Sequence, residues 1–574
     1  MPTASSSDKL AYGFPTPGPQ NPTGQEVMNH VFFLSNAGWK AARETNVYDY
    51  VIVGSGFCAL AFAERMLKNR PASRILILER GSFFLPEHFQ NLPLPYKDTL
   101  GGLSETFPWT LSATTAEGLD GGYIRWQHGM VPFFGGRSTL WSAWCPRPTV
   151  QEMDGWPAET IRAAYENFAS AERLLRVQPA DKIDEGQDAA QRRLIAATRP
   201  VYGELQNRVQ GLLAQGATSV PGIYRSEAAP LASAGEQVDG IDFQKFSTPG
   251  ELLMLTGERG DGHPESRVDI ATECVVEHIV QQNGTATALQ TSRGVLPLGN
   301  AKLILAMGTL PPATLVRNAF PDTANVGERF SAHFITSIVA RVPKEELDPH
   351  GKFGDLEMSA CYVAGTGPQG YSQQYHIQLS ALWDRHPVKN SGTALRYMPD
   401  VVATASMAQL LSSEGYVVFV CAVLGELDYR NDKNWFRRNE QDDDPTTNSL
   451  LQVVENKSDE ETWDAMDEGA FGILEKVLSS GHIQYWHGSP DEGEWTTVRP
   501  SRDERRVPAL VHESSTLHLG REASAPVDLD YRLKAAANVY VTGGGLWPQG
   551  GSWNPTMTMV ALAQDLADKL SAAK

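Results

Sequence analysis

The chain has 574 residues, of which 41% are hydrophobic and 20% are charged, the composition of an ordinary globular protein. This length predicts two to four domains, and the composition excludes a fibrous or wholly disordered chain. With 49 Lys and Arg residues against 68 Asp and Glu residues, the formal net charge is −19, which makes nucleic acid an unfavourable partner.

Signals for membrane insertion and export are missing from the sequence. No run of about 18 apolar residues occurs, so neither a transmembrane helix nor a membrane partner is predicted. The N-terminus lacks the charged and then apolar order of a secretory signal, and we therefore expect a cytoplasmic protein. The five cysteines lie far apart, in no CxxC pair, which is typical of reduced thiols.

The first packed region that the sequence predicts is a βαβ unit. Residues 1–45 are rich in Pro, Ser, Thr and Gly and are expected to form an arm rather than a core element. Tyr48–Val53 and Arg74–Glu79 are predicted to be buried parallel strands, and Ala59–Leu67 between them has the apolar spacing of a helix. Strand, glycine turn, helix and strand in this order form a βαβ unit.

Further elements follow along the chain. Residues 157–176 predict an amphipathic helix that begins at a proline. Residues 268–320 alternate like strands and include a buried strand at Lys302–Met307. Strand-like runs continue from residue 330 to about residue 505, and Asn538–Thr542 is predicted to be a last strand before a C-terminal helix.

The glycine turn after the first strand carries the first chemical signal. Residues 54–59, GSGFCA, are the GxGxxA form of the dinucleotide fingerprint. Gly54 permits a tight turn, Gly56 lets the backbone approach a pyrophosphate, and Ala59 lets the helix pack closely on the strand. Glu79 ends the next strand, where a carboxylate can accept both ribose hydroxyls of an adenosine. The alternative, a glycine turn in an unrelated α/β protein, is disfavoured by this combination.

The start of the C-terminal helix carries the second signal. Asn554-Pro555-Thr556 is a natural helix start, and Asn554 on this interpretation is only a cap. The functional alternative is that the positive end of the helix faces a developing anion, such as the N1–C2=O edge of a reduced flavin. Trp547 and Trp553 beside it suggest a ring-lined pocket, although buried tryptophans more often fill a core.

The third signal is His512, in the stretch HESSTLHLG. A lone histidine is more often structural, but His512 lies 42 residues before Asn554 with a predicted strand between them. His512 and His518 share no helix face, so no metal site is predicted. The absence of a G-x-S-x-G elbow disfavours a serine hydrolase.

Together these motifs resemble those of the glucose–methanol–choline (GMC) oxidoreductase superfamily, most of all its pyranose 2-oxidase branch. The resemblance covers roughly half of the chain. It is carried by GSGFCA with Glu79, by GGRSTLWS at 135–142, by HESST at 512–516 and by GGSWNPT at 550–556.

The resemblance implies an α/β fold (α+β overall) in which a Rossmann-like FAD-binding domain is built from discontinuous segments and a sheet-based domain binds the substrate. The expected boundaries are an arm at 1–45, an FAD-binding domain at 46–170, 240–325 and 508–574, and a substrate-binding domain at 171–239 and 326–507.

The same resemblance implies the site residues. His512 and Asn554 would face the reacting carbon as the catalytic pair, with Trp547 and Trp553 in the substrate pocket. Val275 is expected to hold the adenine through its backbone. The residues expected to bind FAD are Gly54, Gly56, Phe57, Cys58, Ala59, Glu79, Arg80, Gly135, Gly136, Ser138, Thr139, Trp141, Ser142, Val275, Gly544, Asn554, Pro555 and Thr556.

The chain departs from the pyranose 2-oxidase pattern at one informative position. Leu140 stands where that branch has the histidine that links the flavin, and leucine has no nucleophilic nitrogen, so we expect noncovalent FAD. Ser142 replaces a threonine close to flavin N5 and can make the same hydrogen bond with less fixed geometry. Residues 330–505 show no reliable match, so sugar specificity does not carry over.

The predicted function is an FAD-dependent oxidoreductase that oxidises a CH–OH group of a sugar, glycoside or aryl or polycyclic alcohol. His512 would act as base while hydride passes to flavin N5, and O2 or another acceptor would take the electrons. A flavin-dependent lyase or isomerase without net oxidation is the main alternative. An FAD-binding protein without reductive activity and a nicotinamide dehydrogenase are weaker ones, and a homo-oligomer is left open.

Overall fold

Short buried runs of Val, Ile and Leu build a parallel sheet, which we call the floor sheet. The computed structural model describes residues 23–45, 47–91, 109–117, 126–127, 130–183, 200–238, 241–257, 267–399 and 405–572. The floor sheet has the strand order β10-β2-β1-β14-β24, with all neighbours parallel. Its strands are β1 (Tyr50–Val53), β2 (Ile75–Leu78), β10 (Val268–Ala271), β14 (Lys302–Leu305) and β24 (Val539–Val541). The predicted buried strands of this region are confirmed.

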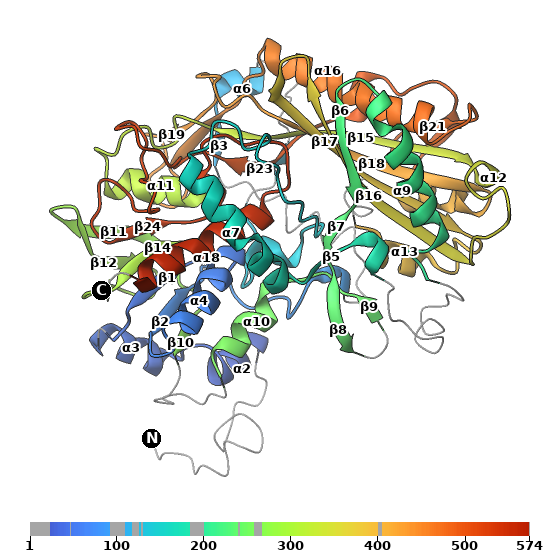
Figure 1. Cartoon of the computed structure of the whole chain (residues 1–574). Helices are drawn as coiled ribbons and strands as arrows, with labels where there is room; N and C mark the ends of the chain where they lie inside the picture. Colours follow the sequence, from blue (N-terminus) through green and yellow to red (C-terminus); the bar gives the residue numbers. More distant parts are fainter. Residues whose placement is uncertain are drawn as a thin grey trace, which may run out of the picture.

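Helices from distant parts of the sequence pack against one another on the floor sheet. α4 (Phe57–Asn69) follows β1 and packs against α18 (Thr556–Ala572), which in turn contacts α7 (Ala158–Leu175), as Figure 1 shows. Every residue from Phe57 to Ala63 is buried, because the small side chains of α4 allow a close approach to the sheet. The βαβ unit and the C-terminal helix therefore form one packed layer.

The crossover from β10 to β14 is a small antiparallel sheet. Its strands are β11 (Val276–Gln282), β12 (Thr285–Thr291) and β13 (Leu296–Pro297). Helix α11 (Leu310–Ala319) begins shortly after β14 and starts with two prolines, which suit the first helical turn.

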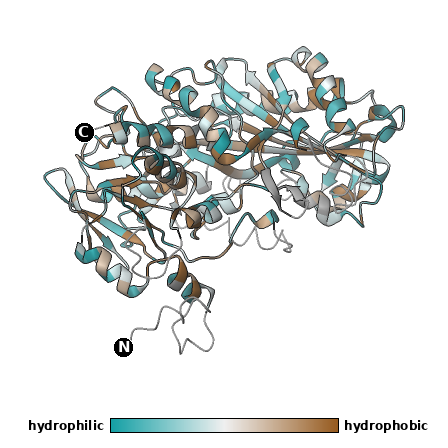
Figure 2. Cartoon of the chain, turned by 60° about the horizontal axis from the view of Figure 1, so that its bottom comes forward, coloured by the Kyte–Doolittle hydropathy of each residue, from teal (hydrophilic) through white to brown (hydrophobic). Residues whose placement is uncertain are grey.

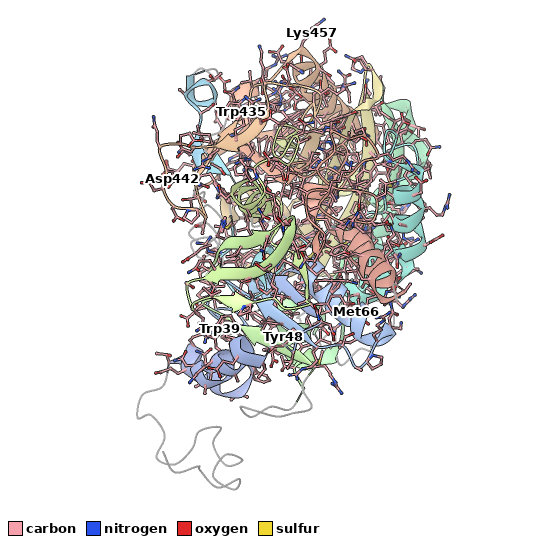
Figure 3. The ribbon with its side chains drawn as sticks, turned by 90° about the vertical axis from the view of Figure 1, so that its left-hand side faces the viewer. Trp39, Tyr48, Met66, Trp435, Asp442 and Lys457 are labelled. Atoms are coloured by element: carbon pink, nitrogen blue, oxygen red, sulfur yellow. The ribbon has the colours of Figure 1, made fainter. Side chains whose placement is uncertain are left out.

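The N-terminal segment is not an arm throughout. Residues 24–45 form α2 (Gly24–Val31) and α3 (Asn36–Thr45), while residues 1–22 lie outside the described residues. Trp39 of α3 is buried and its indole N–H donates to the backbone oxygen of Arg293. Figure 3 shows Trp39 close to the helical layer at the foot of the molecule, near Tyr48. The prediction of an arm was wrong for residues 24–45. The Pro, Ser, Thr and Gly content of residues 1–45 as a whole obscured the spacing of apolar residues in two short amphipathic helices.

A second, mainly antiparallel sheet of nine strands forms the other half of the molecule, and we call it the roof sheet. Several strands of this sheet lie in the region from residue 330 to about residue 505, where strand-like runs were predicted. Its strands are β22 (Gly493–Thr496), β21 (Gln484–Gly488), β15 (Ser331–Pro343), β18 (Tyr416–Glu426), β17 (Gly370–Asp384), β16 (Leu356–Gly367), β6 (Ile223–Ala228), β23 (Arg506–Ser514) and β4 (Trp126–Gln127).

Two helices cover the roof sheet on one side, α9 (Glu204–Gly216) and α16 (Lys457–Gly472) (Figure 1). α16 begins at Asn456 with a capping box, in which Asn456 and Asp459 satisfy each other's backbone N–H. Figure 2 shows hydrophobic residues gathered along the strands of both sheets. The core therefore follows the strands, with the helices as an outer layer.

Two expected domain boundaries fall inside regular elements. Residue 170 lies within α7, and residue 508 lies within β23, which pairs with β15 of the roof sheet. His512 is thus carried by the roof sheet and not by the parallel domain, because hydrogen bonding to β15 extends along β23 past that boundary.

Shorter elements complete the described chain. They are β3 (Thr110–Leu111), α6 (Ala113–Glu117), β5 (Val177–Pro179), β7 (Pro230–Ala232), β8 (Ala234–Val238), β9 (Ile241–Phe243), α10 (Thr248–Leu255), α12 (Lys344–Leu347), α13 (Ser391–Tyr397), α15 (Met407–Leu410), β19 (Trp435–Arg438), β20 (Ser449–Gln452) and α17 (Arg502–Arg505). Among the described helices none is both long and apolar enough to cross a membrane.

Candidate active site

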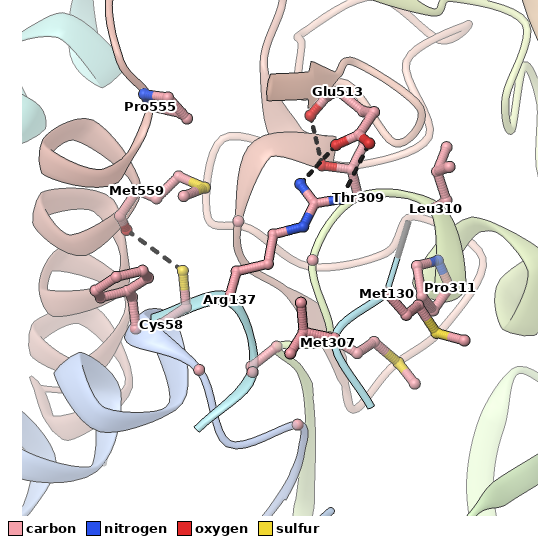
Figure 4. A pocket seen from close by; sticks show the side chains of 18 of the residues that line it. Cys58, Met130, Arg137, Met307, Thr309, Leu310, Pro311, Glu513, Pro555 and Met559 are labelled. Atoms are coloured by element: carbon pink, nitrogen blue, oxygen red, sulfur yellow. Dashed lines mark hydrogen bonds and ion pairs between the residues drawn. The ribbon is translucent and has the colours of Figure 1, made fainter. Parts of the chain in front are cut away.

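A cavity of about 730 Å³ lies where the floor and roof sheets meet. Its lower wall comes from the glycine turn after β1, the end of β2 and the loop after β14, and its upper wall from strands of the roof sheet. Figure 4 shows part of this lining, with Cys58 and Met559 on one side and Thr309 and Glu513 on the other.

The glycine turn offers backbone N–H groups to the cavity. Gly54 has φ +102°, and a Cβ there would lie 2.6 Å from the carbonyl oxygen of Ala306, so only glycine fits. Gly56 is the N-cap of α4 and makes no side-chain cap, and a Cβ on it would meet no protein atom within 4 Å. The first N–H groups of α4 are therefore left to a ligand, and such a helix start favours an anion.

Glu79 lies at the end of β2, as predicted, and is almost fully buried. Its carboxylate accepts hydrogen bonds from Ser55 Oγ at 2.5 Å and from the backbone N–H of Gly81 at 2.8 Å. Burial raises the pKa of Glu79 to about 6. Ser55 Oγ in turn accepts from the N–H of Gly135, so one hydroxyl ties together the two glycine-rich segments that the sequence had singled out.

His512 occupies a bulge in β23. Ser331 of β15 pairs with Ser514, but His333 pairs with Val511, so β23 holds one residue more than its partner. His512 takes φ +61°, a conformation that a non-glycine residue rarely adopts. Bulges re-aim side chains next to active sites, and this one places His512 in the wall of the cavity.

The His512 ring contacts a second histidine. Its Nδ1 lies 2.9 Å from Nδ1 of His333, with the two rings nearly perpendicular. The other ring nitrogen of His333, Nε2, lies 2.7 Å from the carbonyl oxygen of Gly551. Burial lowers the pKa of His333 to about 4, so this ring is neutral at physiological pH.

Asn554 lies on the same cavity and is not the cap of the C-terminal helix. α18 begins at Thr556, and the carbonyl oxygen of Pro555 accepts the first helical hydrogen bond, from Met559. The Asn554 side chain instead accepts a hydrogen bond from Nε2 of Gln378 at 3.0 Å. The capping interpretation was wrong because the helix starts one residue later than expected. Gln378 holds the amide so that its NH2 group is left for another acceptor.

An ion pair that the sequence did not predict lies in the cavity wall. Arg137 Nη1 and Nη2 lie 2.7 Å and 3.0 Å from the two carboxylate oxygens of Glu513, a bidentate arrangement visible in Figure 4. Thr309 Oγ1 donates to the backbone oxygen of Glu513. These bonds hold the residue next to His512 against both the glycine-rich segment and the loop after β14.

Most of the residues expected to bind FAD line the cavity, whereas some lie behind it. Gly544 is buried against Glu513 and Thr309, and its neighbour Gly543 lines the cavity instead. Those in the lining are Gly54, Gly56, Phe57, Cys58, Glu79, Arg80, Gly136, Trp141, Ser142, Val275, Asn554, Pro555 and Thr556. Ala59, Gly135, Ser138, Thr139 and Gly544 are not among the lining residues.

The backbone of Val275 is already engaged. Its N–H donates to Ser292 Oγ and its carbonyl oxygen accepts from the N–H of Ser292. Val275 thus lines the cavity, but only the second lone pair of its carbonyl oxygen is left for a ligand.

Trp547 and Trp553 do not line the cavity. Both are 1% exposed, their rings stack on each other at 5.6 Å, and each also contacts the ring of Trp156. Their predicted role in the substrate pocket was wrong, because three indoles bury their faces against one another and leave none for a ligand.

No cluster of three or more potential metal ligands is found among the described residues. All five cysteines lie in the described part of the chain, where each is buried and outside any disulfide.

Comparisons with known proteins agree with this arrangement. Residues 359–563, which include Gln378, His512 and Asn554, match the family model described as GMC oxidoreductase. Over this stretch, about a third of its length, the chain is similar to GMC oxidoreductases.

Two solved structures share the fold of this chain. A fungal aryl-alcohol oxidase superposes with a TM-score of 0.55 at 13% identity, over 92% of this chain and 99% of that one. Pyridoxine 4-oxidase from Mesorbium loti superposes with a TM-score of 0.53 at 13% identity, over 91% and 99%. No curated protein matches the chain in sequence. At this identity the likeness shows the shared fold.

Proposed function

We propose that this protein oxidises the CH–OH group of an alcohol, with His512 as the base and FAD held without a covalent link. The observation that carries the proposal is that His512 and Asn554 line the same cavity as the glycine turn after β1. The motif at 138–142, STLWS, supports a place near the pyranose 2-oxidase branch.

The residues of the floor sheet fit the ADP part of the cofactor. The start of α4 offers unpaired N–H groups and room at Gly56, which suits a pyrophosphate. The Glu79 carboxylate suits ribose hydroxyls, and Arg80 lines the same wall. Leu140 lines the cavity where the related branch has its linking histidine, and it offers no nitrogen for a covalent bond. When bound, FAD supplies the acceptor for the hydride that leaves the substrate carbon.

The protein supplies the proton chemistry and the orientation. A ring nitrogen of His512 accepts the hydroxyl proton of the substrate. General-base catalysis of this kind typically accelerates a reaction by about 10²–10⁴-fold. The NH2 group of Asn554, fixed by Gln378, donates a hydrogen bond to the same oxygen. Because both residues are held by other strands of the roof sheet, they keep their positions when the substrate binds.

The part of the cavity below the roof sheet is mainly aliphatic. The roof strands contribute three polar residues to the cavity, namely Gln378, His512 and Glu513, and Glu513 is paired with Arg137. The other roof-strand residues in the lining have apolar side chains that cannot bind several hydroxyl groups. These side chains are Ile335, Ala422, Leu424, Val507 and Val511. Among the predicted substrate classes, this lining supports an aryl or polycyclic alcohol over a free sugar.

Anaerobic mixing of the purified protein with sugars, glycosides, aryl alcohols and polycyclic alcohols tests the proposal. Bleaching of the flavin absorbance identifies the donor, and readmission of O2 or a quinone identifies the acceptor. Turnover of a donor with no net electron transfer to any acceptor would instead indicate the lyase or isomerase. Acid precipitation tests the mode of binding, since noncovalent FAD stays in the supernatant and a yellow washed pellet contradicts it.

A further inference from the structure

The hydrogen bonds around His333 have only one consistent direction. A carbonyl oxygen can only accept, so the nitrogen 2.7 Å from Gly551 O, His333 Nε2, must carry a proton. In a neutral imidazole the other nitrogen is then an acceptor. His333 Nδ1 therefore accepts from His512, and the proton between the two Nδ1 atoms belongs to His512.

The surroundings of His333 keep its ring neutral and fix the carbonyl group that it contacts. It is 1% exposed, and burial lowers its pKa to about 4, which keeps the ring neutral. Gly551 has φ +63°, and its N–H donates to Glu426 Oε1 at 2.8 Å. This bond fixes the position of Gly551, whose carbonyl oxygen faces His333. Burial raises the pKa of Glu426 to about 8, so this carboxyl group is mainly uncharged at neutral pH and does not favour a charged His333.

We propose that His333 is a positioning residue that holds His512 in the tautomer with a proton on Nδ1 and none on Nε2. Nε2 is then the atom that accepts the substrate proton. This inference rests on the proposed function in assigning His512 as the base. The assignment of the tautomer itself rests on the hydrogen bonds and on the burial that keeps His333 neutral. Loss of His333 removes the acceptor that favours a proton on His512 Nδ1, and the share of molecules ready to accept a proton on Nε2 falls.

Several other titratable or charged groups surround this pair on the described elements. On β23 the neighbour of His512 is Glu513, whose charge is paired with Arg137. On β17 His376 lies with its ring 6.3 Å from that of His333, and burial lowers its pKa well below the usual range. On β18 the titratable group near the pair is Glu426, which accepts from the N–H of Gly551. These groups do not replace His333 as the acceptor for the proton on His512 Nδ1. Glu426 bonds to the backbone of Gly551, and His376 contacts His333.

The tautomer can be read directly in the FAD-loaded protein by NMR of 15N-labelled histidine. Long-range proton–nitrogen correlations distinguish a protonated Nδ1 from a protonated Nε2, and the signals lost in His512→Ala assign the ring. We expect wild-type His512 to show a protonated Nδ1 at pH 8. A protonated Nε2 overturns the proposal whether or not the protein oxidises alcohols, so its failure is distinct from failure of the proposed function.

Three variants test the consequence for the reaction. His333→Phe removes the acceptor while keeping an aromatic ring, His333→Asn keeps an acceptor oxygen near the Nδ1 position, and His376→Phe is the matched control in the same buried layer. We expect flavin reduction by the best donor to slow at least about tenfold in His333→Phe and to stay within about threefold in the other two. FAD absorbance and thermal unfolding check that each variant folds.

The pH profile separates positioning from loss of structure. The bond to His333 Nδ1 is stronger when His512 is charged, so His333→Phe lowers the pKa of the base and moves the midpoint of the reduction profile to lower pH. His333→Asn is expected to restore the wild-type midpoint. Equal slowing in His333→Phe and His376→Phe with unchanged midpoints overturns the role of His333. If His333→Phe does not fold, the wild-type NMR spectrum still tests the tautomer of His512, and His333→Asn still tests the role of His333.

Discussion

The floor and roof of the cavity are built in different ways. The floor offers backbone groups from a turn and a helix start that are contiguous in sequence, from Gly54 to Cys58. The roof offers side chains from separate strands, and each depends on a partner from another strand or loop, as His512 does on His333. Backbone recognition of a common cofactor needs only a local motif, whereas side-chain chemistry on a substrate needs long-range register. Floor variants should therefore change cofactor binding, and roof variants the rate of reduction.

The largest effect is expected from His512→Ala. The floor is untouched, so the variant should fold, bind FAD and keep a normal flavin spectrum. Reduction by a good donor should slow by about 10²–10⁴, equivalent to about 3–5 kcal/mol, because the substrate hydroxyl has no proton acceptor. Stopped-flow bleaching measures this, and reoxidation by the acceptor should suffer less. Equal reduction rates in the variant and the wild type would remove His512 from the mechanism.

Two glycine variants of the floor should differ from each other. Gly54→Ala forces φ +102° on an alanine and places its Cβ 2.6 Å from Ala306 O, so the protein should lose about 1–3 kcal/mol or more of unfolding free energy. Gly56→Ala meets no protein atom and should leave the FAD-free protein close to wild type in stability. Its methyl group stands in the space proposed for the pyrophosphate, so FAD affinity should fall at least about tenfold. Thermal unfolding and FAD titration measure the two quantities, and wild-type FAD affinity in Gly56→Ala would contradict the placement.

A buried floor carboxylate should make stability depend on pH. Burial raises the pKa of Glu79 from about 4.5 to about 6, so the folded state disfavours its charged form. The FAD-free protein should lose about 2 kcal/mol from this group as the pH rises from 4.5 through 6. Glu79→Gln lacks this loss, so its stability relative to wild type should improve over that window and stay constant above it. Denaturant unfolding at pH 4.5, 6 and 8 tests this, and a pH-independent difference counts against it.

The smallest effect is expected from Gln378→Leu in the roof. The variant removes the hydrogen bond that orients Asn554, so the amide can turn its oxygen toward the substrate oxygen. We expect reduction to slow about tenfold, equivalent to one lost hydrogen bond of about 1–1.5 kcal/mol, with FAD affinity unchanged. Asn554→Ala should slow reduction at least as much and, because Asn554 is not the helix cap, should not unfold α18. A fall in FAD affinity in Gln378→Leu would show that a roof residue also contributes to cofactor binding, contrary to the division of roles between floor and roof.

The sequence by itself determined the floor of this protein. The strand, glycine turn, helix and Glu79 lie within about 30 residues, a βαβ unit whose geometry follows from local backbone rules. His512 and Asn554 were found by resemblance and lie in the cavity, although the role of Asn554 as a cap did not hold. Only the tertiary structure decided what supports them. His333 is 179 residues from His512, and Gln378 is 176 residues from Asn554. Such pairs depend on strand register and on a bulge at His512, and these are set by the packing of the whole roof sheet rather than by any local pattern.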